Sequence, residues 1–427
     1  MLRQCIAGHP PLELPRILLE EPCAQALFGI LIEGLADRFE PALCDAYARL
    51  FSRAIEASSQ GAGQDPAALV ARYRRVRRPR PIALQPRRVL VLSRVTLGAD
   101  VAVTSVLLAA AKQAFPNAAI VFVGPRKNFE LFAADPRLSH AAVEYRRGSL
   151  RERLAVWDDL KALASAPDCL VLDPDSRLTQ LGMLPIGDED RYHLFESRRY
   201  GGRSDHNLPT LAAQWASETL GVPNAAPYVA PAPLPLSFPE IVGRTGYPLG
   251  PSARVPLDPL LTAQAGGAVA SAPPAPYIAV SLGVGENPAK RISDSFEGEL
   301  LALLSARAPL AIDKGAGGEE AARVERAVAR SGARATFWEG SFAGFAQVIA
   351  GSSLYVGYDS AGQHVAAACG VPLIGIFAGF PAPRMFHRWR PSGPRATVIR
   401  VDQPDPVEIL AQVARALAEY PRTSFGL

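Results

Sequence analysis

The sequence predicts an α/β protein with two domains, because short apolar strands alternate with helices in two separate sets along the chain. The first set occupies residues 86–222 and the second occupies residues 277–420. Between them, residues 223–276 are rich in Pro, Ala and Gly with little periodicity, which is typical of an interdomain connection. Residues 1–85 show helical spacing only and are expected to form an N-terminal helical extension. This pattern predicts two α/β domains that face each other across a cleft.

The extension contains three expected helices. Apolar residues recur at helical spacing over 17–35 and 42–55, and residues 67–76 fit a third helix. A basic run broken by prolines closes the segment at 72–81. Such a run favours a solvated linker, and a patch for anionic lipid headgroups or an anionic acceptor is the alternative.

Each α/β set begins with a strand and continues with helices that separate further strands. In the first domain we expect strands at 88–93, 119–124 and 169–173, with helices at 101–115 and 208–220. In the second domain we expect strands at 277–282, 310–313, 335–338, 354–357 and 373–377, with helices at 296–304 and 319–330.

Composition excludes several classes of protein. The net charge of +4 is too small to predict a nucleic-acid partner. No signal peptide is expected, and no apolar run is expected to reach the roughly 18–20 residues of a membrane helix. The five cysteines are scattered and never spaced as Cys-x-x-Cys, so we expect buried thiols in a cytoplasmic protein. The histidines show no metal-ligand spacing.

Residues 353–372 are the most informative stretch of the chain. They read as a buried strand, a polar turn at Asp359-Ser360 and a helix that begins at Ala361. The first turn of such a helix offers free backbone N–H groups and a positive dipole end, and the small Ala361 and Gly362 would let a phosphate approach. This pattern predicts a phosphate or sugar-nucleotide site. The alternative is that Ser360 is an ordinary N-cap and that Asp359 complements the dipole.

Two more loops of the second domain follow strands in the same way. The loop at 281–291 contains Gly283 and ends in Lys290-Arg291, which fits a diphosphate clamp, although it is neither a P-loop nor a dinucleotide fingerprint. The loop at 313–320 ends in Glu319-Glu320, either of which could bind ribose hydroxyls. Read singly, these are an exposed turn and two first-turn acids. Together, their places at the carboxyl ends of parallel strands favour one ligand site.

In the first domain, residues 95–105 join the first strand to its helix. Asp100 lies there near Gly98 and Thr104, at the carboxyl end of a strand. A carboxylate in this place could act as general base on a substrate hydroxyl, and its ordinary interpretation is an N-cap or first-turn acid. Asp173-Pro-Asp175 has the spacing of a metal-binding Asp-x-Asp pair, but it lies in the other domain from the expected diphosphate.

The order of these motifs resembles glycosyltransferase family 9, of the ADP-heptose:lipopolysaccharide heptosyltransferase type with GT-B architecture. The resemblance covers roughly residues 88–417. The residues that carry it are Gly98-Ala-Asp100, Phe115-Pro-Asn-Ala118, Lys290-Arg291, Asp359-Ser-Ala-Gly-Gln-His364, Ala366-Ala367 and Gly370-Val-Pro372.

The resemblance implies inverting, metal-independent transfer of a sugar, heptose among the candidates, from a nucleotide-diphospho-sugar to a glycan or glycolipid in lipopolysaccharide biosynthesis. It implies that Asp100 is the base, and that Lys290 and residues 360–362 hold the diphosphate. Asp359 would contact the donor sugar, and His364 would support the turn or reach the phosphates. No cofactor or metal is expected. The acceptor implies a protein in the cytoplasm or peripheral at the inner face of the membrane.

Three departures from the family pattern leave other functions open. Ala99 separates Gly98 from Asp100, Ala361 changes the loop at 359–364, and residues 378–383 replace the usual ending of the signature. The alternatives are a nucleotide-sugar epimerase or hydrolase on the same two Rossmann-like domains, and a catalytically degenerate GT-B binding or scaffold protein. The extension at 1–85 could form a homodimer, dock a partner or cover the acceptor groove.

Overall fold

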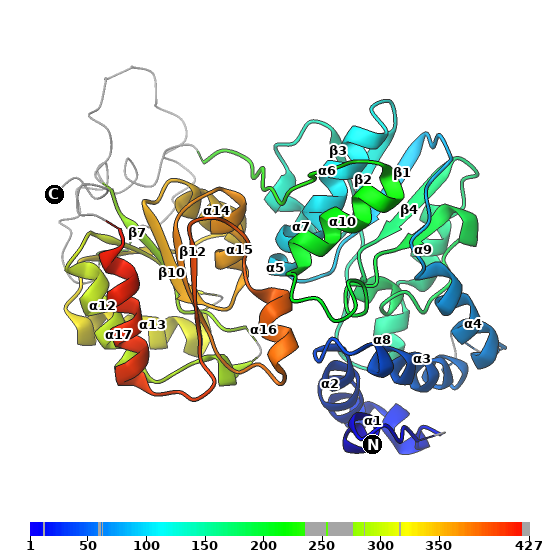
Figure 1. The fold of residues 1–427 in the computed structure, drawn as a ribbon, viewed down its shortest axis with the longest axis horizontal. Helices are drawn as coiled ribbons and strands as arrows, with labels where there is room; N and C mark the ends of the chain where they lie inside the picture. Colours follow the sequence, from blue (N-terminus) through cyan, green and yellow to red (C-terminus); the bar gives the residue numbers. More distant parts are fainter. Residues whose placement is uncertain are drawn as a thin grey trace. The chain divides into compact units, whose positions relative to one another are not determined.

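The computed structural model describes residues 1–11, 13–58, 61, 63–234, 253–254, 276–285, 287–315 and 317–420. The chain divides into two compact units (Figure 1). Unit 1 consists of Met1–Tyr228 and Pro381–Trp389, and unit 2 consists of Val229–Phe380 and Arg390–Leu427. Most of the connection expected at 223–276 lies outside the described residues.

Unit 1 is built on a parallel sheet with the strand order β3-β2-β1-β4-β5. Its order reverses between β1 and β4, which is the switch point where open α/β sheets bind ligands at their carboxyl edge. The strands β1, β2 and β4 were expected from the sequence, whereas β3 and β5 were not. The strands are β1 (Arg88–Leu92), β2 (Ala119–Gly124), β3 (Leu138–Ala142), β4 (Cys169–Asp173) and β5 (Tyr192–Leu194).

The helix after β1 is continuous over Leu97–Ala114. It comprises α5 (Leu97–Ala99), a π-helical turn at Asp100–Thr104 and α6 (Ser105–Ala114). By length and hydropathy alone this segment could cross a membrane, which corrects the expectation that no run was long enough. Because 67% of it is buried inside the protein, it has the character of a core helix. The other helices of this part are α7 (Arg126–Phe129), α8 (Leu150–Leu154), α9 (Trp157–Ala164) and α10 (Leu208–Leu220).

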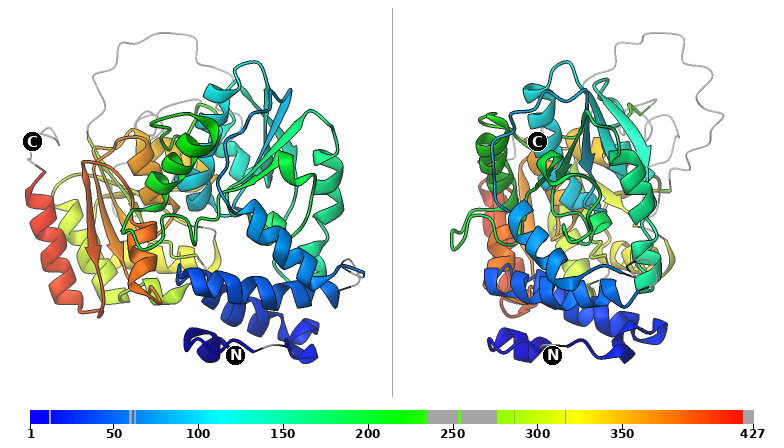
Figure 2. Two further views of the ribbon diagram at one scale, coloured as in Figure 1. Left: turned by 45° about the vertical axis from the view of Figure 1, so that its right-hand side comes forward. Right: turned by 90° about the vertical axis from the view of Figure 1, so that its right-hand side faces the viewer.

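The N-terminal segment forms α1 (Leu2–Ile6), α2 (Glu33–Ala36), α3 (Pro41–Glu56) and α4 (Pro66–Val76). The helix expected at 17–35 is instead broken into short 3-10 turns and a π-helical stretch, and the backbone is extended at Glu20 between the first two turns. Side chains of this segment share one hydrophobic core with strands β1, β2 and β5. Figure 2 shows α3 and α4 at one end of the unit 1 sheet. The segment is therefore part of unit 1.

Unit 2 contains a second parallel sheet with the order β12-β11-β10-β7-β8-β9-β6. Its four central strands are wholly or almost wholly buried, as expected for a sheet covered on both faces. The strands are β6 (Ala253–Arg254), β7 (Ile278–Ser281), β8 (Leu310–Asp313), β9 (Ala335–Trp338), β10 (Leu354–Tyr358), β11 (Leu373–Phe377) and β12 (Ala396–Arg400). The helices are α12 (Asp294–Ser305), α13 (Gly318–Ser331), α14 (Phe342–Ala350), α15 (Ala361–Ala368) and α17 (Pro406–Ala418).

Helix α16 (Pro383–Trp389) follows β11 in the chain but belongs to unit 1. Arg384 donates hydrogen bonds to the carbonyl oxygens of Phe39 and Gly202. Arg388 is almost fully buried and donates to the carbonyl oxygens of His206 and Gly202. These bonds attach the short helix to two loops of unit 1.

Candidate functional site

The three loops of unit 2 that were expected to bind a ligand lie side by side. They follow β7, β8 and β10, which are neighbours in the sheet, so their carboxyl ends meet at one edge. The loop after β7 ends in a 3-10 turn at Pro288–Lys290, and the loop after β10 leads directly into α15.

Lys290 joins two of these loops. Its Nζ lies 2.7 Å from Asp359 Oδ2 and donates a hydrogen bond of 3.0 Å to the Asp359 carbonyl oxygen. Asp359 Oδ1 also accepts a hydrogen bond from Gln363 Nε2 at 2.5 Å. The cation and the carboxylate that were predicted to contact the donor are thus paired with each other and held at the start of α15.

Ser360 occupies the N-cap position of α15 without forming a side-chain cap. In contrast, the N-cap side chains of α12, α14 and α17 accept hydrogen bonds from backbone N–H groups. The backbone N–H groups at the start of α15 are therefore not satisfied by Ser360, and the ordinary N-cap interpretation does not describe this turn. Ala361 and Gly362 form the first helical positions.

Gly362 is required by close packing beneath this turn. A Cβ atom on Gly362 would lie 2.2 Å from Tyr355 Oη, closer than any normal contact. Tyr355 comes from β10 and is fully buried. The turn that was expected to seat a phosphate thus lies directly on the tyrosine side chain.

His364 lies one turn further along α15 and is buried. Burial lowers its pKa to about 4, and the nearby charges of Asp359 and Lys290 act in opposite directions. The imidazole is therefore neutral at neutral pH. Of its two expected roles, this geometry favours support of the turn over charge pairing with phosphates.

Glu320, rather than Glu319, faces the loops. A Cβ atom built on Gly283 would lie 2.7 Å from Glu320 Oε1. The carboxylate of Glu320, on α13, therefore lies beside the loop after β7. Burial, with a further contribution from Glu320, raises the pKa of Asp313 to about 6. Glu319 is exposed and pairs with Arg326 at 2.6 Å. Asp313 and Glu320 thus lie near each other at the carboxyl edge of the sheet.

Arg291 does not join the clamp that the sequence predicted. Its Nε lies 2.9 Å from Glu297 Oε1, and a second ion pair links it to Asp294. Glu297 is fully buried and also pairs with Arg323 at 2.6 Å. This network anchors the start of α12, and a role for Arg291 at the donor stays a prediction.

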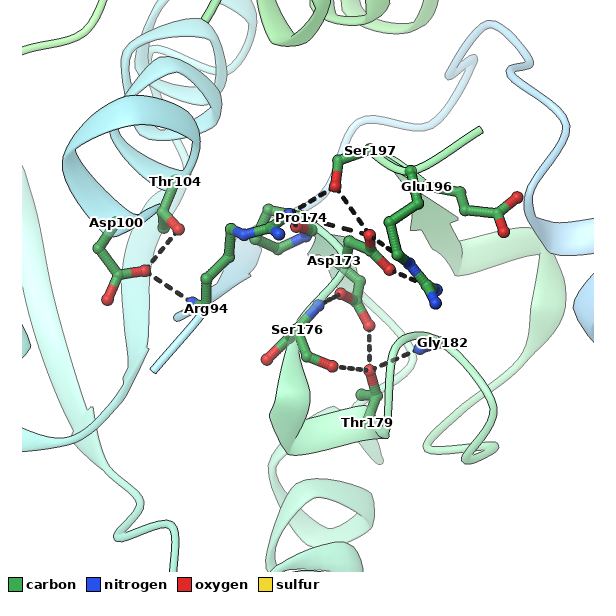
Figure 3. A network of polar contacts seen from close by, with 12 residues as sticks. Arg94, Asp100, Thr104, Asp173, Pro174, Ser176, Thr179, Gly182, Glu196 and Ser197 are labelled. Carbon is green, nitrogen blue, oxygen red and sulfur yellow. Dashed lines mark hydrogen bonds and ion pairs between the residues drawn. The ribbon is translucent and has the colours of Figure 1, made fainter. Parts of the chain in front are cut away.

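In unit 1, Asp100 is fully buried and accepts four hydrogen bonds, of which Figure 3 shows those from Arg94 and Thr104. Its Oδ1 accepts from the Arg94 backbone N–H and Thr104 Oγ1, and its Oδ2 accepts from Ser93 Oγ and Asn128 Nδ2, each at 2.6 Å. Burial raises the pKa of Asp100, and these hydrogen bonds oppose the rise. In this conformation the carboxylate holds the loop after β1 and has no lone pair free for a substrate proton.

The spacing around Asp100 has a local explanation. Gly98 lies in α5, and Ala99 is followed by the π-helical turn at Asp100–Thr104. A π-helical hydrogen bond closes over one more residue than an α-helical bond, so this turn accommodates the additional residue between Gly98 and Asp100. π-helical turns of this kind are frequent at functional sites.

Sequence reasoning missed a buried polar network at the carboxyl ends of β1, β4 and β5 (Figure 3). Arg94 NH1 donates to the Pro174 carbonyl oxygen at 2.6 Å and to Ser197 Oγ at 2.9 Å. Asp175 accepts two hydrogen bonds from Arg198, at 2.9 and 3.0 Å. The sequence feature that could have predicted this network is a charged residue shortly after each of the three strands. Among the residues that the structure describes, no group of three or more His, Cys, Asp or Glu side chains is arranged to hold a metal ion.

A family model described as glycosyltransferase family 9 (heptosyltransferase) matches residues 302–411, which lie in unit 2. Over these residues the chain is similar to glycosyltransferase family 9. The family resemblance and the enzyme class expected from the sequence are thereby confirmed. No curated protein matches the chain.

Solved structures with the same fold include three glycosyltransferases. A family 9 glycosyl transferase from Veillonella parvula DSM 2008 has 14% identity and a TM-score of 0.54, over 79% of this chain and 91% of that chain. The E. coli heptosyltransferase WaaC, solved with ADP-2-deoxy-2-fluoro heptose, has 17% identity and a TM-score of 0.51, over 78% and 100%. E. coli ADP-heptose lps heptosyltransferase II has 18% identity and a TM-score of 0.50, over 78% and 99%. These matches confirm the two-domain GT-B fold of this glycosyltransferase.

Proposed function

We propose that this glycosyltransferase transfers a sugar, with inversion and without a metal ion, from a nucleotide-diphospho-sugar to a glycan or glycolipid acceptor. The observation that carries the proposal is the Lys290–Asp359 pair at the uncapped start of α15, inside a family 9 unit. Lys290 and the backbone N–H groups of residues 361–362 supply positive charge where the diphosphate leaves.

The donor proposed first is ADP-heptose. Two structures with the same fold are described as heptosyltransferases, and one of them was solved with an ADP-heptose analogue. Asp313 and Glu320 suit the ribose hydroxyls of any nucleotide, so they do not select the base. A nucleotide-sugar donor agrees with a location in the cytoplasm or at the inner face of the membrane.

Asp100 is the proposed base, provided that one of its four donors turns away when the acceptor binds. In the reaction the acceptor oxygen forms a bond to the anomeric carbon, the bond from that carbon to the diphosphate breaks, and the acceptor proton passes to the carboxylate. Catalytic hydrogen bonds often rearrange in the substrate complex.

Replacement of Asp100 separates these roles. Because Asp100→Asn turns an amide N–H2 group toward two hydrogen-bond donors, the melting temperature should fall in either case. If Asp100 is the base, the folded variant also loses about 100-fold or more in kcat. If Asp100 only holds the loop, the melting temperature falls while the folded enzyme keeps its kcat. Measurement of both quantities on one preparation decides between the two, and the second result removes Asp100 from the mechanism.

The donor site is tested by thermal shift with ADP, UDP, GDP, CMP and dTDP. We expect one nucleoside diphosphate to stabilise the wild-type protein, and Lys290→Met to weaken its binding by about tenfold or more through loss of charge-assisted hydrogen bonds. Lys290→Arg keeps the charge, and Arg334→Met removes an exposed charge elsewhere in unit 2, so it is the matched control.

The outcomes of this experiment also test the alternatives. Stabilisation by none of the nucleotides would contradict the proposal and favour a binding or scaffold protein. Consumption of the sugar nucleotide by the purified protein without any acceptor would favour a hydrolase or epimerase.

A further inference from the structure

The switch point of the unit 1 sheet contains a buried arginine for which the reaction as proposed has no use. Arg94 follows β1 and reaches toward the loops after β4 and β5 (Figure 3). Its side chain is nine-tenths buried, with 10% of its surface exposed. In open α/β sheets ligands bind in the crevice at the switch point, which here lies between the loops after β1 and β4.

The charge of Arg94 is incompletely compensated by its neighbours. Its two hydrogen-bond acceptors, the Pro174 carbonyl and Ser197 Oγ, are neutral. The nearest carboxylate oxygen, Asp175 Oδ2, is 3.9 Å from NH1 and already accepts hydrogen bonds from Arg198 and Ser197. Among the described residues, Arg94 Nε has no hydrogen-bond partner. A buried cation in this state is stabilised by a further anion.

The backbone on both sides of the crevice is held in an unusual conformation. Val95, next to Arg94, has φ 71°, and Asp175 has φ 68°. Positive φ is rare for residues other than glycine and is a true outlier for a β-branched valine. Val95 lies in the loop after β1 and Asp175 in the loop after β4, and strain of this kind gathers at ligand sites.

The guanidinium is also held in place from a third side. Its carbon lies 5.7 Å from the centre of the Trp389 ring, which belongs to α16 of the same unit. An aromatic ring and two hydrogen-bond acceptors fix the orientation of the planar guanidinium, and its remaining N–H groups can then meet the oxygens of an anion.

We propose that Arg94 binds an anionic group of the acceptor, a carboxylate or a phosphate, in a site that unit 1 builds between the loops after β1 and β4. This proposal rests on the proposed glycosyl transfer. It makes Arg94 a specificity-determining residue, because an acceptor without the anionic group would leave the buried cation without its partner.

The test is a calorimetric titration of the full chain with inorganic phosphate in one arm and acetate in the other. The nucleotide site is first saturated with the nucleoside diphosphate that stabilises the protein, so that phosphate cannot bind there. We expect Arg94→Met to weaken binding of the preferred anion by about tenfold or more and Arg94→Lys to weaken it less. Arg126→Met, at an exposed arginine of the same unit, is the matched control and should bind as the wild type does.

Equal binding by the wild type and Arg94→Met, or binding of neither anion by the wild type, would overturn the proposal. If Arg94→Met does not fold, labelling of the wild type by phenylglyoxal replaces it. Phosphate or acetate should then slow the modification of Arg94 measured by peptide mass spectrometry, and an unchanged rate would overturn the proposal. Failure of every nucleotide to bind would remove the proposed function, while Arg94-dependent anion binding would still be measured.

Discussion

Burial has the same consequence for Asp100 and His364, although their charges have opposite signs. Each side chain is buried, and burial penalises its charged form, so the pKa of Asp100 rises and that of His364 falls. Four hydrogen bonds stabilise the charged carboxylate of Asp100 and oppose the rise in its pKa. His364 instead stays neutral beside the Lys290–Asp359 pair, so that the pair, and not the imidazole, determines the charge at the start of α15.

The neutral His364 makes stability depend on pH. Its pKa is about 4 in the folded protein and near 6.5 otherwise, so the unfolded chain binds a proton that the folded chain does not. Stability is therefore lost as pH falls from 6.5 to 4, by about 3 kcal/mol at most. Urea unfolding of the wild type and His364→Gln across this range measures the effect as a difference, which cancels other titrating groups. An equal slope with pH in both proteins would contradict it.

The residues of the donor site show what the sequence can and cannot predict. Lys290 and Asp359 are found because each follows a strand, and strand order brings their loops together. Glu319 and Glu320 could not be distinguished, because consecutive helical residues point about 100° apart and the sequence does not show which one faces the loop. The pairing of Arg291 with Glu297 could not be read from the sequence, because Glu297 is also held by Arg323 and Tyr358, which are distant in the chain.

At the scale of elements, the strands missed from the sequence lie at the edges of the sheets. They are β3 and β5 in unit 1 and β6 and β12 in unit 2. Central strands read as nearly continuous apolar runs because both faces are covered, and β1, β4, β7 and β10 were found in this way. β3, with the sequence Leu-Ser-His-Ala-Ala, is only partly buried, and its polar residues hide the strand pattern.

Helix α15 offers a test of how closely its first turn is packed. In Gly362→Ala the new methyl group would collide with Tyr355, so the turn or the tyrosine must shift. We expect a loss of about 1–3 kcal/mol in unfolding free energy and weaker binding of the nucleotide. In the control Gly187→Ala the added methyl group would meet its neighbours at 3.6 Å or more, an ordinary contact. Unchanged nucleotide affinity in Gly362→Ala would show that the turn does not depend on this packing.

At the scale of the whole molecule, the N-terminal helices are part of the fold of unit 1. Tyr73 on α4 donates a hydrogen bond to Glu196, which adjoins the Ser197–Arg198 part of the polar network. Tyr47 on α3 donates to the Gln180 carbonyl oxygen at 2.7 Å. The sequence showed helices in this segment but could not show that they pack on the loops after β4 and β5, since no motif marks a contact across more than a hundred residues.

A pair of substitutions on α3 tests this integration. Phe51 is fully buried in the shared core, so Phe51→Ala should lower the unfolding free energy of unit 1 by about 3–5 kcal/mol. Arg53 is two residues away and its side chain is 54% exposed, so Arg53→Ala should change it by less than about 0.5 kcal/mol. Calorimetric melting of both variants provides the comparison. Equal effects would mean that the segment is attached only loosely.

Helix α16 has a consequence for synthesis of the chain. Unit 1 needs residues 381–389, because Arg384 and Arg388 bind the carbonyl oxygens of Phe39, Gly202 and His206. A ribosome has made more than nine-tenths of the 427 residues before this helix emerges. Domains usually fold in order as they leave the ribosome. Here the first domain to be made cannot be completed until the second has been translated almost to its end.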